Sequence, residues 1–130
     1  MHEPIHHSVV INAPPDLVYT ALTDSAQFSK MSGGAPATIG TDAGSAFSCF
    51  GGMIEGRQIE LVKNQRIVQA WRVKDWPAGV YSLVRFELAP EAGGSTRIEF
   101  DHVGFPPPGR EHLDTGWTTN YWDPLKKLLG

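Results

Sequence analysis

The stretch from Gly109 to Gly130 carries the clearest hydrophobic pattern in the chain. Large apolar side chains recur there at steps of four, four, four and three residues: Leu113, Trp117, Tyr121, Leu125 and Leu128. Because an α-helix completes a turn about every 3.6 residues, this spacing places the five side chains on one side of a helix. The pattern therefore predicts a C-terminal helix with one large, mostly aromatic face.

The sequence of this predicted helix contains weak helix formers and one proline. Gly116 and Asn120 have modest helix propensity, so packing of the apolar face must stabilise the helix. Pro124 cannot donate to the carbonyl of Asn120, which predicts a kink at that position. The alternative is a separate short helix that begins at Asp123 and Pro124.

Upstream of this helix the pattern mainly alternates with a period of two, which predicts strands. The expected strands cover residues 5–12, 45–50, 56–62, 66–73, 80–88 and 95–103, with a short strand over 37–39. One helix interrupts this series after Pro14 and Pro15, since proline is tolerated in a first helical turn. Its expected buried stripe consists of Leu17, Val18, Ala21 and Leu22. A further helical turn is expected over 26–30.

The last predicted hairpin has one apolar face and one charged face. Its apolar side chains share one parity: Val84, Phe86, Leu88, Ile98, Phe100 and His102. Its charged side chains share the other parity: Arg85, Glu87, Arg97, Glu99 and Asp101. The C-terminal helix must bury its aromatic face, and the apolar face of the sheet is where it fits. The pattern thus predicts an α+β protein with a helix laid across an antiparallel sheet.

Composition narrows the class of protein. A length of 130 residues predicts a single domain over residues 1–130. A net charge of −3 and the absence of a basic stripe argue against nucleic-acid binding. Cys49 is the single cysteine, so an internal disulfide cannot form. Since no apolar stretch approaches about 20 residues and no signal peptide is visible, we expect a cytoplasmic protein without a membrane span.

Five segments, in order along the chain, resemble one superfamily. They are Val10–Pro15 with Leu22–Asp24; Phe28 with Ala35–Ala37; Phe47 and Phe50–Gly52 with Gly56; Arg66–Arg72; and Gly116–Trp117 with Tyr121–Trp122 and Leu125–Lys126. This pattern resembles the helix-grip superfamily of steroidogenic-acute-regulatory-type (START) lipid-transfer domains, polyketide cyclases and birch-pollen-allergen proteins. Within it, the sequence is similar to the domain homologous to the activator of the heat-shock-protein-90 ATPase. The turn at Lys74–Pro77 strengthens that likeness.

The resemblance implies a fold and a set of functions. The expected fold is a curved antiparallel sheet that grips a long C-terminal helix, with two short helices after the first strand. Members of the superfamily include ligand carriers, enzymes and binding modules. The eukaryotic co-chaperone also has a separate N-terminal domain, and the resemblance implies that this chain corresponds to the C-terminal-type domain alone.

Metal, cofactor and nucleophile chemistry finds little support in the sequence. His6 and His7 are adjacent on a strand and point to opposite faces, so they cannot chelate one metal together. The glycine pairs match neither a phosphate loop nor a dinucleotide fingerprint, so we expect no cofactor. Ser45, Ser48 and Cys49 lack identifiable histidine and carboxylate partners, so we assign no catalytic residue.

Three polar residues are candidates for an interior site. His102 shares the parity of Phe100, Gln69 that of Trp71, and Arg57 that of Leu61. If these parities face inward, each group needs a partner, because burying an unpaired polar or charged group is costly. The partner of Arg57 would be an anionic ligand head group or a neighbouring glutamate. The alternative is a surface arginine, since a β-bulge shifts parity.

The remaining candidates are aromatic: Trp71, Phe86, Phe100, Trp117 and Tyr121. An empty apolar pocket of ~300 Å³ would cost ~7 kcal/mol, as much as the whole stability of a small domain. The space between helix and sheet must therefore be filled by these rings, by water or by a ligand.

Three functional hypotheses follow. The first is a non-catalytic domain that binds a small hydrophobic ligand between sheet and helix through Arg57, Gln69, Trp71, Phe86, His102, Trp117 and Tyr121. The second is a co-chaperone-like module that binds a chaperone of the heat-shock-protein-90 type through its surface, for instance the Trp76–Pro77 turn and the 31–44 loop. The third is a cyclase-type enzyme with His102 as acid or base. The oligomeric state is left open.

Overall fold

The computed structural model describes residues 3–130, which form one antiparallel sheet of seven strands. The strands are β1 (Ile5–Ile11), β2 (Thr38–Ile39), β3 (Ala46–Cys49), β4 (Ile54–Val62), β5 (Arg66–Val73), β6 (Ser82–Glu91) and β7 (Ser95–Val103). Their order across the sheet is β1-β7-β6-β5-β4-β3-β2. The first strand thus pairs with the last, and every other neighbour in the sheet is also a neighbour in sequence.

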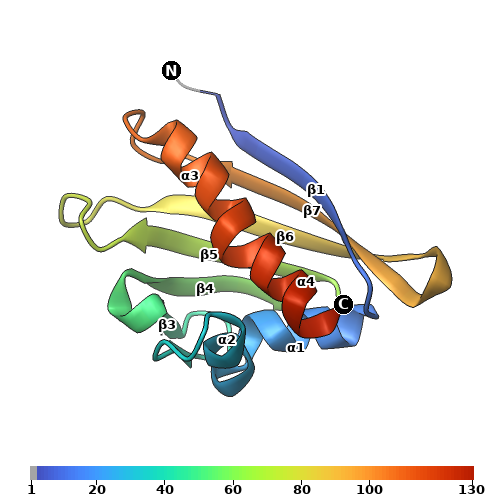
Figure 1. Cartoon of the computed structure of the whole chain (residues 1–130). Helices are drawn as coiled ribbons and strands as arrows, with labels where there is room; N and C mark the ends of the chain where they lie inside the picture. Colours follow the sequence, from blue (N-terminus) through green and yellow to red (C-terminus); the bar gives the residue numbers. More distant parts are fainter. Residues whose placement is uncertain (1–2) are drawn as a thin grey trace.

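Helices cover one face of this sheet (Figure 1). Two short helices, α1 (Pro15–Thr23) and α2 (Ser25–Met31), follow β1. The C-terminal helix consists of α3 (Arg110–Trp117), a π-helical turn (Thr118–Trp122) and α4 (Asp123–Leu129). It runs diagonally across the sheet, and α1 and α2 both contact α4. The α+β helix-grip fold expected from the sequence is therefore confirmed.

The two short helices are joined by a capping residue. α1 begins at Pro15, where the missing N–H costs no hydrogen bond. The carboxylate of Asp24 accepts from the N–H of Gln27 at 3.0 Å and so caps α2. Val18 and Leu22 are buried as expected, whereas Leu17 is 48% exposed. The stripe was predicted one residue too wide, because Leu17 lies at the edge of the buried face.

The predicted faces of the last hairpin are confirmed. Its apolar side chains are buried, namely Val84, Phe86, Leu88, Ile98, Phe100 and His102. On the opposite face, Arg85 Nη2 lies 2.6 Å from Asp101 Oδ2, and Arg66 Nε lies 2.5 Å from Glu87 Oε1. The sheet therefore has an inner face against the C-terminal helix and an outer face that carries ion pairs.

The C-terminal helix runs from α3 to α4 as one continuous ribbon (Figure 1), and Pro124 lies in the first turn of α4. The N–H of Asp123 donates to the carbonyl of Thr118, five residues earlier, so the turn before the proline is wider than an α-helical turn. This wider turn brings Trp117, Tyr121, Trp122 and Leu125 all to the buried face. The irregularity expected near Asn120 and Pro124 is thus a π-turn, and α4 begins at Asp123 as the alternative predicted, although it continues the same helix.

A β-bulge in β4 changes which side chains face inward. The register against β5 shifts between Gln58 and Glu60. Gln58 is fully buried, whereas Arg57 is exposed and Ile59 is 52% exposed. Leu61, beyond the bulge, packs against the core again. Arg57 therefore does not share an inward face with Leu61, and the alternative of a surface arginine next to a β-bulge is the one that the structure has.

Gly56 provides a test of how tightly β4 packs. A Cβ atom at this position would lie 1.8 Å from the carbonyl oxygen of Ala70 and 2.8 Å from Cε1 of Phe47. We expect Gly56→Ala to lower the free energy of unfolding by about 3 kcal/mol or more, because backbone and ring must both move. Equilibrium unfolding in urea measures this change.

Gly116 offers the matched control, because its Cβ would meet only the Asn120 amide, at 3.6 Å. Gly116→Ala should raise the free energy of unfolding by up to about 1 kcal/mol, since alanine favours helix. Equal stability of the Gly56→Ala variant and the parent protein would contradict the close approach of β4 and β5.

Candidate functional site

Six of the seven predicted site residues meet between the sheet and the C-terminal helix. They are Gln69 and Trp71 on β5, Phe86 on β6, His102 on β7, Trp117 on α3 and Tyr121 in the π-turn, and all are at most 6% exposed. The distance between ring centroids is 4.3 Å for Trp117 and Phe100, 4.4 Å for Trp117 and Tyr121, and 5.2 Å for Trp117 and Trp71. The aromatic rings are thus in direct contact across the interface.

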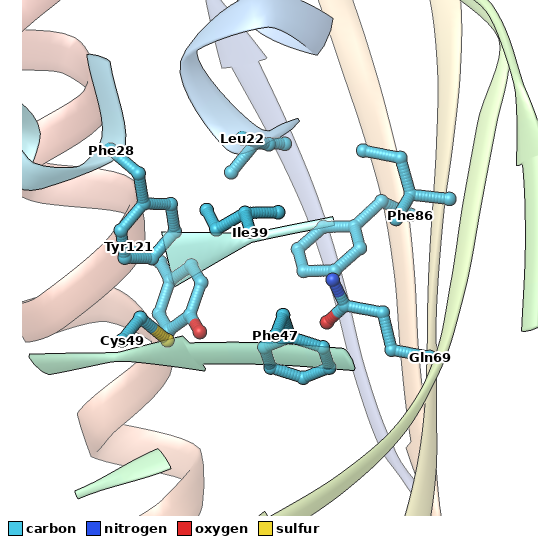
Figure 2. Close-up of a pocket in the computed structure, with 9 residues that line it drawn as sticks. Leu22, Phe28, Ile39, Phe47, Cys49, Gln69, Phe86 and Tyr121 are labelled. Atoms are coloured by element: carbon cyan, nitrogen blue, oxygen red, sulfur yellow. The ribbon is translucent and has the colours of Figure 1, made fainter. Parts of the chain in front are cut away.

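A small cavity remains beside these rings (Figure 2). It is lined by Leu22, Phe28, Ile39, Phe47, Cys49, Ile67, Gln69, Phe86 and Tyr121. Its volume is about 10 Å³. A volume of this size holds at most about one water molecule, whereas ligand pockets start at about 300 Å³. The aromatic side chains therefore fill the space in which a hydrophobic ligand was expected.

A buried polar group of Tyr121 borders the cavity. In Figure 2 the Tyr121 hydroxyl lies beside the sulfur of Cys49. Burial, together with the neighbouring Cys49, holds the pKa of Tyr121 well above its usual value. Burial raises the pKa of the Cys49 thiol to about 12. Both groups are therefore neutral at physiological pH, and Cys49 is not an activated nucleophile.

The indole N–H of Trp71 is a buried donor near the same place. It makes no hydrogen bond within residues 3–130. Its approach to the Tyr121 hydroxyl opposes the rise of the Tyr121 pKa, but it falls short of hydrogen-bond geometry. An unsatisfied buried donor costs about 1–3 kcal/mol, so the surrounding packing must outweigh this loss.

His102 is buried in a chain of hydrogen bonds that defines its protonation. Nε1 of Trp117 donates to Nδ1 of His102 at 3.0 Å. Nδ1 is thus an acceptor, so the ring proton is on Nε2, which lies 2.7 Å from Oγ of Ser82. Ser82 in turn donates to the carbonyl of Trp71 at 3.1 Å. Because Nε2 already carries a proton, His102 cannot take one from Ser82, and the pair is structural.

A second tryptophan makes the same kind of bond on β1. Nε1 of Trp122 donates to Nδ1 of His7 at 2.8 Å, and Nε2 of His7 donates to Oδ1 of Asp114 at 2.5 Å. The C-terminal helix is therefore attached to both strands at this end of the sheet, β7 and β1, by an indole–imidazole hydrogen bond.

Gln58 is an interior residue that the sequence interpretation missed. Its Oε1 accepts from Nε2 of Gln69 at 3.1 Å, and its own Nε2 donates to the carbonyl of Gly40 at 3.3 Å. The parity of Ile54 and Gly56 would have placed it inward. The partner that Gln69 needs is thus supplied by the protein itself.

Arg57 lies outside this interior, on the outer face of the sheet. Its side chain is exposed, and Nη1 donates to the carbonyl of Gly44 at 3.2 Å. Arg57 and Tyr81 border an outer-face groove of about 330 Å³, whose other lining residues are Thr38, Ala46, Phe47, Ser48, Glu55 and Gly56. We refer to this feature as the Arg57 groove.

Arg72 organises the loop beside the Arg57 groove, a role that the sequence did not reveal. It is only 9% exposed, and its guanidinium donates to Glu55 Oε1 at 3.0 Å and to the carbonyls of Trp76 at 2.7 Å and Val80 at 3.3 Å. Trp76 is half-buried against Trp71, with ring centroids 5.8 Å apart. The Trp76–Pro77 turn is therefore held against the sheet, and only Pro77 is exposed.

The described residues offer no metal site and no membrane span. Within residues 3–130, no three histidine, cysteine, aspartate or glutamate side chains converge on one point. In the same part of the chain, no helix is long and apolar enough to cross a bilayer.

Several known proteins that are similar to this chain share one description. The family model for Activator of Hsp90 ATPase homolog 1-like protein matches residues 12–130. The chain is 29% identical over 125 residues to Activator of 90 kDa heat shock protein ATPase homolog 2 of Mus musculus, covering 96% of this chain and 37% of that protein. It is 31% identical over 96 residues to homolog 1 of Homo sapiens, covering 74% of this chain and 28% of that protein.

A solved structure is similar over its whole length. It is an HSP90 activator from Plasmodium falciparum, with a TM-score of 0.93 and 26% identity. The similarity covers 99% of this chain and 97% of that one. The chain thus spans about a third of the two curated relatives but nearly all of this structural relative.

The bond between Trp117 and His102 can be tested by removing the donor. Trp117→Phe leaves the buried Nδ1 of His102 without its donor and leaves a gap beside Phe100. We expect the free energy of unfolding to fall by about 2–4 kcal/mol. Thr118→Ala, at an exposed neighbouring position, should change it by less than about 0.5 kcal/mol. A similar effect of both substitutions in urea unfolding would contradict the role of Trp117.

The burial of Cys49 predicts slow thiol chemistry. Since its pKa is raised to about 12, the thiolate fraction at pH 8 is about 10⁻⁴, and access is blocked as well. We expect no reaction of the folded protein with an aromatic disulfide reagent within minutes. One thiol should react at once in guanidinium chloride. Rapid labelling of the folded protein would show that Cys49 is accessible.

Proposed function

We propose that this chain, which belongs to the family of Activator of Hsp90 ATPase homolog 1-like proteins, is a non-catalytic protein-binding module whose partner is a chaperone of the heat-shock-protein-90 type. The observation that carries this proposal is the filled interior. A domain whose rings occupy the space between sheet and helix has only its surface left for recognition. Surface recognition is what a module that docks on another protein requires.

The small cavity argues against a ligand carrier. A volume of about 10 Å³ is more than an order of magnitude below that of an ordinary ligand pocket. Admitting a lipid-like molecule would require several of the rings around Trp117 to separate. Each such ring contributes a few kcal/mol by its burial, so opening would cost much of the stability of the domain.

The buried groups argue equally against the cyclase-type enzyme. Both ring nitrogens of His102 are engaged by Trp117 and Ser82, and the residue is 0% exposed. A general acid or base needs a free nitrogen within reach of a substrate. Cys49 and Tyr121 are held in their neutral forms and are also buried.

The comparisons support a chaperone as the partner. The structural relative from Plasmodium falciparum is described as an HSP90 activator and matches this chain over 97% of its length. The curated relatives carry the same activity in their names, but this chain corresponds to only 28–37% of them. We therefore propose binding for this chain first, and stimulation of the ATPase as its consequence.

The proposal can be tested with two purified proteins. We expect the chain to bind the heat-shock-protein-90 type chaperone of its own organism in isothermal titration calorimetry, and to raise the steady-state ATPase rate of that chaperone. No detectable binding at about 100 µM, equivalent to a binding free energy weaker than about 5.5 kcal/mol, would contradict the proposal. Binding without a change in the ATPase rate would limit the proposed function to binding of the chaperone, without stimulation of its ATPase.

Native mass spectrometry tests the rival hypothesis on the same sample. We expect this protein, purified from cells under mild conditions, to show the mass of the polypeptide alone. A retained lipid-like molecule, present in stoichiometric amount, would favour the ligand carrier and would show that the interior opens.

A further inference from the structure

Arg57 differs from every other arginine in the charge that surrounds it. Each of the others lies within 4.0 Å of a carboxylate: Arg66, Arg72, Arg85, Arg97 and Arg110. Within residues 3–130, Arg57 has no such partner and donates only to the carbonyl of Gly44. An exposed guanidinium with donors to spare is thus left in the Arg57 groove.

The neighbours of Arg57 in its row across the sheet are small or apolar. Strand register aligns Ala46, Arg57, Ala70, Leu83 and Val103 in one row across the outer face of the sheet. Alanines on both sides of Arg57 leave the sheet surface hollow at this point. Farther along the row, Leu83 is 48% exposed and Val103 is 39% exposed. The cation therefore lies beside an apolar strip.

One wall of the Arg57 groove, formed by Tyr81, contacts a buried arginine. Tyr81 is 48% exposed, and its ring centroid lies 5.8 Å from Cζ of the buried Arg72. Arg72 also pairs with Glu55, so this carboxylate is already neutralised and does not cancel the charge of Arg57. A side chain restrained by such a contact before binding loses less entropy when a partner docks.

We infer that the Arg57 groove is a docking site for a segment of the partner protein that combines one acidic side chain with a neighbouring apolar side chain. The carboxylate pairs with the guanidinium of Arg57, which presents parallel N–H donors to both carboxylate oxygens. The apolar side chain covers Tyr81 and Leu83. Arginine and tyrosine are, with tryptophan, the residue types in which the hot spots of protein interfaces are enriched.

The charge of the groove selects this occupant over others. A nucleic acid or a membrane surface needs several cations, but the groove offers one, on a chain whose net charge is −3. A small free ligand is held by enclosure on most sides, whereas this groove is open and continues into an exposed apolar strip. An extended protein segment fits both features.

This inference rests on the proposed function in that the partner is taken to be the chaperone. The first experiment compares the affinity of that chaperone for the parent protein, Arg57→Gln and Arg85→Gln. Arg85 is the matched control, because it is exposed on the same face but already pairs with Asp101. We expect Arg57→Gln to raise the Kd about tenfold or more, and Arg85→Gln to change it less than about twofold.

Two further variants separate the contribution of the charge of Arg57 from that of the shape of the groove. Arg57→Lys keeps the charge but loses the paired donors, so its Kd should lie between those of the parent and Arg57→Gln. Tyr81→Ala should also weaken binding, because it removes the apolar wall. Equal chaperone affinity of the parent and Arg57→Gln would overturn the inference and leave the proposed function intact.

A second experiment keeps the test independent of the chaperone. A phage-displayed random peptide library is selected on the parent protein and counter-selected on Arg57→Gln. We expect enrichment of peptides with an acidic residue next to an apolar one. If the chaperone does not bind the parent protein, the proposed function fails, and the peptide selection alone then tests whether the Arg57 groove is a docking site. Recovery of no such peptides would then overturn the inference as well.

Analytical ultracentrifugation tests whether a second copy of the chain occupies the Arg57 groove instead. The parent protein should give the same sedimentation coefficient as Arg57→Gln. A dimer that Arg57→Gln converts to a monomer would assign the groove to self-association and would overturn the inference.

Discussion

The arrangement of this domain depends on two hydrogen bonds from indole N–H groups to imidazoles. Trp117 donates to His102 on β7, and Trp122 donates to His7 on β1. Burial of apolar rings supplies most of the free energy, but it is not directional, so it would tolerate a helix that slides along the sheet. Two directional bonds to two different strands determine one position.

These bonds also explain the π-helical turn. In an α-helix, residues five apart point about 140° away from each other, so Trp117 and Trp122 could not both face the sheet. The wider turn over Thr118–Trp122 takes nearly one revolution for the same five residues. Both indoles then reach their histidines, and the turn ends where Pro124 has no N–H to offer. The proline and the π-turn are therefore compatible features of one helix.

Periodicity predicted much of the fold because it reports on local geometry. The strands 66–73 and 95–103, the buried face of the last hairpin and the C-terminal helix all follow from spacing alone. The filled interior does not, since a cavity volume is the small difference between a large enclosed space and the rings of Trp71, Phe86 and Trp117. The sequence identified those rings but could not show how much of the gap they fill.

Parity alone could not place Arg57 for a different reason, and that reason links the interior to the outer face. In a regular β4, either Gln58 and Glu60 or Arg57 and Leu61 would point into the interior. The first arrangement would bury the charge of Glu60, and the second would bury the charge of Arg57. The bulge at this point turns Gln58 and Leu61 inward together and leaves both charges in solvent. Gln58 then satisfies Gln69, so that the interior needs no polar ligand. The same irregularity that completes the interior thus presents Arg57, without a carboxylate partner, to the outside. A domain that has closed its own cavity can still carry a recognition site, and here one bulge accounts for both properties.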